Sequence, residues 1–140
     1  MRILGVDYGR KRIGLAISDE AQYLARPLDP YFRTHSGKRD LKALSRLAHE
    51  QEAGSMVFGL PLNMDGTKGE MALEVEEFVQ QLRPIANMDI IVSDERLTSV
   101  EAERVLLLGN VKRKDRKLLR DGLAATLILQ GYLDSRAWVD

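Results

Sequence analysis

Acidic residues occur at three places where the local sequence is otherwise apolar. Asp7 ends the first apolar run, Asp94 and Glu95 follow the last apolar run that has strand length, and Asp121 lies among apolar residues at helical spacing. An unpaired carboxylate at the buried end of a strand is costly, so a cation is expected to compensate it. If these strand ends and the helix meet, three carboxylates converge on one pocket. A divalent cation is the usual compensation for such crowded negative charge.

The donor atoms favour particular metals. Carboxylate oxygens suit Mg²⁺ or Mn²⁺ rather than zinc. The chain has no cysteine and only two histidines, which excludes thiol catalysis, disulfides, cysteine-ligated zinc and a histidine-rich site. Two such metal ions can activate a water molecule and stabilise the leaving oxygen in phosphodiester hydrolysis. The acids therefore predict a metal-dependent nuclease.

Each acid also has a purely structural interpretation. Asp7 could cap the turn that follows it, and Asp121 could be a solvated helix residue paired with a lysine. Glu95 could form a surface ion pair with Arg96. Asp94 could be the ligand in place of Glu95, because strand alternation puts these neighbours on opposite faces. The residues alone leave these choices open.

Basic residues form two groups that could contact phosphates, although the net charge is zero, with 21 basic and 21 acidic residues. One group is the turn 10–12 and the other is the run 112–120. The loop 60–69 is long for a compact domain, and such loops are often functional. Phosphate contacts position a strand and make binding salt-sensitive, without reading sequence. The residues expected to contact nucleic acid are Arg10, Lys11, Arg12, Asn63, Arg96, Lys112, Arg113 and Lys114.

Strands and helices alternate in a way that positions these residues. The first twenty residues are typical of a hairpin, and its first strand is apolar on both faces, which predicts a central strand. The third strand contains two prolines, which favours a sheet edge. The expected strands are 3–7, 13–19, 23–33, 55–59 and 88–93. The expected helices are 40–53 ended by Gly54, 70–83 ended by Pro84, one beginning at Thr98 with a capping box to Glu101, and 115–134 after a basic linker 112–117.

This order predicts one α/β domain spanning residues 1–140, a mixed five-stranded sheet with helices on both faces. Hydrophobic residues make up 44% of the chain and charged residues 30%, which is typical of a soluble globular protein. No apolar run has the roughly 18 residues of a membrane span, and the N-terminus lacks a signal-peptide pattern. We therefore expect a cytoplasmic protein that does not enter membranes.

Four segments in chain order resemble the YqgF, or RuvX, family of ribonuclease H-like proteins. They are residues 5–14 (GVDYGRKRIG) with Ser18-Asp19, residues 59–67 (GLPLNMDGT), residues 94–98 (DERLT), and Asp121 followed by Ala124-Ala125. The resemblance implies a ribonuclease H-like fold. It also implies that Asp7, Glu95 and Asp121 are the catalytic acids and the ligands of Mg²⁺ or Mn²⁺, and so selects Glu95 over Asp94.

The resemblance also implies a function. Members of this family were first described as Holliday junction resolvases and are now mostly assigned to 5′-end maturation of precursor 16S rRNA. The expected partners are thus precursor 16S rRNA and ribosomal particles, with branched DNA as the alternative. RuvC-type resolvases carry a further acid three residues from the one on the last helix. Here Ala124 and Leu118 occupy those positions, which weakens the resolvase interpretation.

Other functions remain as alternatives. A junction resolvase cuts two strands symmetrically and calls for a homodimer, whereas the RNA nuclease is expected as a monomer or weak homodimer. Actin-like ATPases also open with a glycine-flanked aspartate, but they close two such domains over ATP, and 140 residues supply one. A non-catalytic RNA-binding assembly factor would not need the acidic triad.

Overall fold

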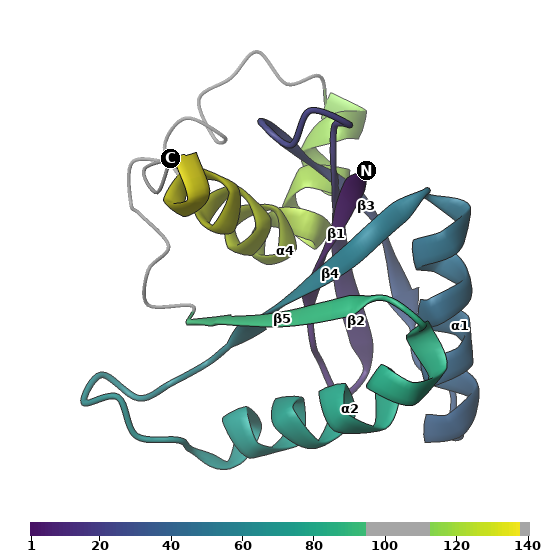
Figure 1. The fold of residues 1–140 in the computed structure, drawn as a ribbon, viewed down its shortest axis with the longest axis vertical. Helices are drawn as coiled ribbons and strands as arrows, with labels where there is room; N and C mark the ends of the chain where they lie inside the picture. Colours follow the sequence, from purple (N-terminus) through teal and green to yellow (C-terminus); the bar gives the residue numbers. More distant parts are fainter. Residues whose placement is uncertain (95–112, 138–140) are drawn as a thin grey trace.

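The computed structural model describes residues 1–94 and 113–137, with the backbone alone for 113–121 and 137. Within these residues the chain forms five strands and three helices (Figure 1). In chain order they are β1 (Arg2–Asp7), β2 (Arg12–Ser18), β3 (Ala25–Phe32), α1 (Gly37–Glu50), β4 (Ala53–Leu60), α2 (Glu70–Ala86), β5 (Asp89–Asp94) and α4 (Arg113–Ala137). The helix expected from Thr98 lies outside the described residues.

The five strands form one mixed sheet in the order β3-β2-β1-β4-β5. Strand β1 is antiparallel to β2 and parallel to β4, so that Val6 is opposite both Leu15 and Phe58. It is the central strand, as its two apolar faces predicted. Strand β3, which contains Pro27 and Pro30, is an edge strand, also as predicted.

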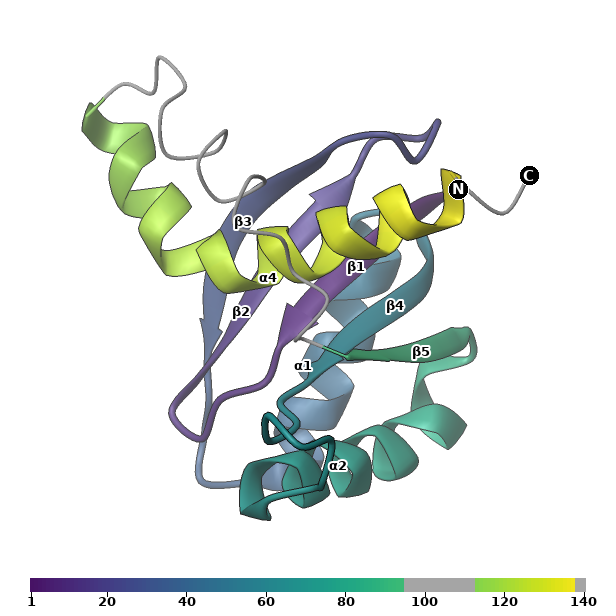
Figure 2. The same ribbon diagram turned by 90° about the vertical axis from the view of Figure 1, so that its left-hand side faces the viewer.

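Helices cover both faces of the sheet. Leu4 and Val6 of β1 belong to a large apolar cluster with residues of α1 and α2. Ile3 belongs to a second cluster, which includes Ala125 and Leu129 of α4. Figure 2 shows α4 running across one face of the sheet, with α1 behind it. The predicted layered α/β architecture is therefore confirmed.

Helix α4 approaches the sheet so closely that side chains are absent at two contact points. A Cβ atom on Gly5 of β1 would lie 2.7 Å from the Cβ of Leu129 and 3.0 Å from the carbonyl oxygen of Ala125. A Cβ on Gly122 would lie 2.8 Å from the Cβ of Pro27 and 3.2 Å from the carbonyl oxygen of Leu15. Glycine at these positions lets the helix backbone rest on the strands.

Helix α1 differs from the prediction at both ends. It begins at Gly37 rather than residue 40, because the Ser36 hydroxyl accepts a hydrogen bond from the Arg39 amide and caps the helix. It ends at Glu50, and the chain leaves it through Glu52, whose φ of 60° is left-handed. The expectation that Gly54 ends this helix is wrong, since β4 has already begun there.

Two further boundaries differ. Pro84 does not stop α2, which continues to Ala86 and ends at Asn87 in the left-handed conformation. Proline removes the hydrogen bond from position 84 to the carbonyl four residues earlier, but Ile85 and Ala86 pack in the core cluster, which favours the continued helix. The backbone of α4 begins at Arg113, so most of the expected basic linker 112–117 is helical.

The contact at Gly122 predicts opposite effects for two glycines of the same helix. Gly122→Ala should lower the free energy of unfolding by about 1–3 kcal/mol, because the new methyl group overpacks the contact with β2 and β3. Gly131→Ala should raise it by up to about 1 kcal/mol, because no described atom lies within 4 Å of its added Cβ. Urea unfolding of both variants measures the difference. Equal effects would contradict the close contact.

Candidate active site

Asp7 is the last residue of β1 and is half-buried on the face of the sheet that α4 covers. Side chains alternate along a strand. Ile3 contacts the α4 cluster, whereas Leu4 and Val6 contact the cluster under α1 and α2, so Asp7 shares the face of Ile3. The residue opposite it on β2 is Gly14, which has no side chain to crowd the carboxylate.

The Asp7 carboxylate is only partly compensated. Burial raises the pKa of Asp7, and the positive charge of Arg12 opposes this shift without cancelling it. The charged form is therefore held in surroundings that disfavour it. A carboxylate in this condition is suited to bind a further cation, which agrees with the prediction from the sequence.

The backbone of α4 brings position 121 to the same end of the sheet. Gly122 lies against the carbonyl of Leu15, and Leu15 adjoins Gly14, the residue opposite Asp7. Position 121 also precedes Ala125 by one helical turn, and Ala125 contacts the sheet. The structure thus places the backbone of Asp121 near Asp7.

Asp94 lies on the face opposite to Asp7. It ends β5, and its register partner on β4 is Leu60. Leu60 packs in the cluster under α1 and α2, as does Val92, two residues before Asp94. Strand alternation therefore separates Asp94 from the α4 face. This placement argues against Asp94 as a third ligand beside Asp7.

Several predicted site residues cannot be placed. Glu95, Arg96 and Lys112 lie outside the described residues, and only the backbone of Arg113 and Lys114 is described, in α4. Across the described part of the chain, no three His, Asp or Glu side chains are grouped so that they could hold a metal ion. Because two of the three predicted ligands have no described side chain, the metal centre stays a prediction.

The basic turn after Asp7 is anchored on its α2 side. The guanidinium of Arg10 forms an ion pair with Glu74, to which its Nε donates at 2.9 Å, and lies 3.8 Å from Glu70. Tyr8 donates a hydrogen bond to the same Glu74 carboxylate at 3.2 Å. Arg10, predicted to contact nucleic acid, therefore serves at least in part to hold the turn against α2. Lys11 and Arg12 are exposed.

The loop 60–69 is ordered by its own hydrogen bonds. The Asn63 amide donates to the Thr67 hydroxyl at 2.9 Å, and Asp65 accepts from the Thr67 backbone amide at 3.0 Å. Leu62 and Lys68 form an isolated β-bridge across the loop. The Asn63 side chain, predicted to contact nucleic acid, is thus engaged within the loop through its amide nitrogen.

A buried ion pair that sequence reasoning missed supports the basic turn. The Asp40 carboxylate is fully buried and accepts hydrogen bonds from the Tyr31 hydroxyl, the Arg33 guanidinium and both the amide and hydroxyl of Thr34. Burial alone would raise the pKa of Asp40, but these donors outweigh it and lower the pKa. Arg33 also donates to the carbonyl of Gly9 at 3.2 Å.

One feature of the sequence could have indicated the ion pair between Asp40 and Arg33. Asp40 lies four residues before Leu44, so it shares the buried face of α1 and needs a partner there. The partner, Arg33, comes from the end of β3, and no spacing rule connects a strand end with the following helix. The guanidinium of Arg33 also stacks over the ring of Tyr8, 5.1 Å from its centre.

None of the helices that the structure describes is long and apolar enough to cross a membrane.

Comparison with known proteins gives matches over nearly the whole chain. The family model described as "RuvX: Holliday junction resolvase" matches residues 1–135. A protein of Thermoanaerobacter pseudethanolicus is 45% identical over 97% of this chain and 98% of its own length. One of Endomicrobium trichonymphae is 42% identical over 95% of both chains, and one of Bacillus thuringiensis is 40% identical over 97% and 100%. All three are named "Putative pre-16S rRNA nuclease".

Among solved structures, the chain is similar to RuvC of T. thermophilus in complex with a Holliday junction substrate. The TM-score is 0.63 at 17% identity, and the match covers 97% of this chain and 96% of RuvC. A second structure of RuvC from Thermus thermophilus gives a TM-score of 0.60 at 14% identity. The match covers 99% of this chain and 97% of that RuvC chain. At this identity the likeness shows the fold, which is the predicted ribonuclease H-like fold.

Removing the charge of Asp40 should destabilise the protein. Asp40→Asn leaves the mostly buried Arg33 without its counter-ion, so we expect a loss of about 3 kcal/mol in the free energy of unfolding at pH 7. Because the pKa of folded Asp40 is lowered, the wild type also loses this contribution as the pH falls below about 4. Urea unfolding at pH 7 and pH 3 should show the difference shrinking in acid. If the difference in free energy of unfolding between the wild type and Asp40→Asn grew in acid, the lowered pKa of Asp40 would be contradicted.

Removing the charge of Asp7 should have the opposite effect when no divalent metal is present. Asp7→Asn relieves the cost of burying a charged carboxylate, so Tm at neutral pH in EDTA should rise by on the order of 3 °C, equivalent to about 1 kcal/mol. Asp29→Asn, which alters an exposed acid of β3, is the control and should leave Tm unchanged. A lower Tm for Asp7→Asn would show that the carboxylate is already compensated.

Proposed function

The chain belongs to the RuvX family, and from this premise we propose that it is a divalent-metal-dependent endonuclease that acts on precursor 16S rRNA in ribosome biogenesis. Relatives that are 40–45% identical over nearly the whole chain are named as pre-16S rRNA nucleases, which supports the substrate. The observation that carries the proposal is Asp7. Its half-buried, incompletely compensated carboxylate lies where the backbone of α4 approaches the end of β1.

In this proposal Asp7, Glu95 and Asp121 hold Mg²⁺ or Mn²⁺. Glu95 is preferred to Asp94 in this proposal because Asp94 lies on the face of the sheet opposite to Asp7. The chemistry of the donors fits, since carboxylate oxygens are the preferred ligands of both ions. Bound metal would activate water and stabilise the leaving oxygen of the phosphodiester. The protein's own contribution is to hold the carboxylates on rigid elements.

Residues around Asp7 are suited to hold an RNA strand. Arg12 is exposed, acts electrostatically on Asp7, and is opposite Phe32 on β3. Phe32 is 69% exposed, and its neighbour Tyr31 points to Asp40 under α1, so alternation puts Phe32 on the α4 face. An exposed aromatic side chain can stack on an unpaired base, which favours single-stranded or looped RNA.

A four-way DNA junction is the second candidate substrate. The description of the matching family model names a Holliday junction resolvase. The fold is compatible with both substrates. Arg12 and Lys11 would contact phosphates of either nucleic acid, so the substrates must be distinguished by cleavage.

The decisive experiment compares cleavage of a precursor 16S rRNA fragment and a DNA four-way junction in Mg²⁺ and in Mn²⁺. The variants are Asp7→Asn, Glu95→Gln and Asp121→Asn, with Asp94→Asn as the matched control on the opposite face. We expect RNA cleavage by the wild type to fall at least about a hundredfold in the three triad variants, which lose metal-bound charge stabilisation. Asp94→Asn should retain cleavage.

The other outcomes are equally informative. Cleavage of the junction alone would establish the second candidate. Activity lost in Asp94→Asn and retained in Glu95→Gln would show that Asp94, and not Glu95, is the metal ligand. Activity that survives Asp7→Asn would refute the catalytic assignment. The Tm increase caused by Mn²⁺ in the wild type, and absent from Asp7→Asn, would separate metal binding from cleavage.

A further inference from the structure

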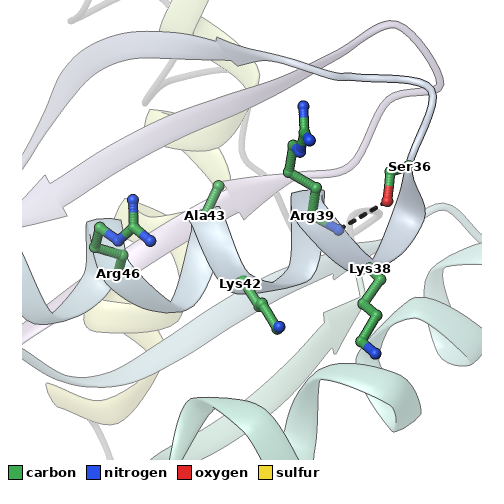
Figure 3. A pocket seen from close by; sticks show the side chains of 6 residues that line it. All are labelled: Ser36, Lys38, Arg39, Lys42, Ala43 and Arg46. Atoms are coloured by element: carbon green, nitrogen blue, oxygen red, sulfur yellow. Dashed lines mark hydrogen bonds between the residues drawn. The ribbon is translucent and has the colours of Figure 1, made fainter.

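Helix α1 carries a cluster of four exposed cations on its outer side. They surround a shallow depression, with Ala43 at its centre and Ser36 at one end, as Figure 3 shows. We call this the α1 basic surface, and its cations are Lys38, Arg39, Lys42 and Arg46. The opposite side of the helix, with Leu41 and Leu44, is buried against the sheet.

The cations of this surface lack acidic partners among the described residues. Ion pairs are formed by other described cations, such as Arg10, Arg33 and Lys68, and none of these pairs involves the α1 basic surface. In Figure 3 Arg39 and Arg46 lie on either side of Ala43 and extend upward from the helix, whereas Lys38 and Lys42 extend below it. The charges are therefore available to a ligand.

Helix stability alone does not account for this arrangement. Lys38 and Arg39 lie in the first turn of α1, where the helix macrodipole favours acids and disfavours cations. Lys38, Lys42 and Arg46 follow one another at intervals of four residues, a spacing at which like charges repel. An anionic partner would relieve both effects.

The α1 basic surface begins at the end of the sheet that holds the candidate active site. The Arg33 amide donates to the carbonyl of Lys11 at 2.9 Å, which joins the end of β3 to the basic turn after Asp7. Ser36, at the edge of the surface, follows only three residues later. Helix α1 covers the face of the sheet opposite to Asp7. A long polyanion held at the active site would therefore pass around the basic turn at the end of the sheet before it continues along α1.

We propose that the α1 basic surface binds the phosphodiester backbone of the RNA substrate at a distance from the cleaved bond. This inference rests on the proposed function, which brings structured RNA to the chain. Lys38 and Arg46 are eight residues apart, about 12 Å along a helix. That length matches three or four successive phosphates of one strand at about 3.4 Å each along a duplex axis.

An acidic protein is a poorer match for the surface. Protein interfaces depend on buried aromatic and apolar anchors. The exposed large hydrophobic residues of the described chain lie elsewhere, and none belongs to α1. A surface of cations around one alanine instead resembles a backbone-positioning contact, which carries charge without base recognition.

The test measures RNA binding rather than cleavage. A fluorescein-labelled RNA hairpin with a single-stranded tail is titrated in EDTA at several salt concentrations with the wild type and with Lys42→Gln/Arg46→Gln. Glutamine keeps helix propensity, so the fold should be retained, and circular dichroism verifies it. We expect the affinity to fall roughly tenfold and the slope of log Kd against log salt to decrease by about 2.

The matched control removes two exposed cations at the other end of the molecule. Arg26 lies near the start of β3, and Arg136 lies near the end of α4, where it contacts Gln22. Arg26→Gln/Arg136→Gln should change the salt slope much less than Lys42→Gln/Arg46→Gln. Equal slopes for these two variants would overturn the proposal, because the effect would then reflect net charge alone.

Two further results are decisive. Unchanged RNA affinity combined with lost binding of polyglutamate would assign the surface to an acidic protein and overturn the proposal. Because EDTA prevents metal-dependent cleavage, the binding result is independent of nuclease activity. A wild type that binds RNA through α1 but never cleaves it would refute the proposed function and leave this surface in place.

Discussion

The close approach of α4 to the sheet is the constraint on which the candidate site depends. Contact at Gly5 and Gly122 involves backbone atoms, so the distance between helix and strands is fixed without flexible side chains between them. Hydrophobic packing of Ala125 and Leu129 then holds the helix in that position. Rigid placement of this kind is what convergent acidic groups on a strand end and a helix require.

Among the described residues, Asp40 is fully buried and Asp7 is half-buried, and the surroundings of the two carboxylates differ. Asp40 is surrounded by donors from Tyr31, Arg33 and Thr34, and its pKa is lowered. Asp7 has Arg12 nearby, yet burial prevails and its pKa is raised. The first carboxylate is fully satisfied within the protein and stabilises the fold, whereas the second is left with unused capacity for a cation. Aspartate thus has a structural role at position 40 of α1 and a proposed metal-binding role at position 7 of β1.

Sequence patterns predicted the parts of this protein that depend on local rules. The apolar run ending at Asp7 identified the central strand, and the prolines of β3 identified an edge. Helix ends were predicted less well, because Ser36 caps α1 earlier than its apolar spacing indicated, and Pro84 is tolerated in a last turn. Only the family resemblance selected Glu95 over Asp94 from the sequence, and the placement of Asp94 opposite to Asp7 depends on which sheet face α4 covers. That is a property of tertiary packing, which no local pattern contains.

The position of α4 in the chain has a consequence for the timing of activity during protein synthesis. All five strands are complete by Asp94, and domains begin to fold while the ribosome is still translating. The helix that closes over Gly5 is made later, and it supplies the third acid of the proposed site. A nascent chain can therefore assemble its sheet while remaining without a complete catalytic centre. In the proposed function, the third acid of the metal site is therefore absent until α4 has been synthesised.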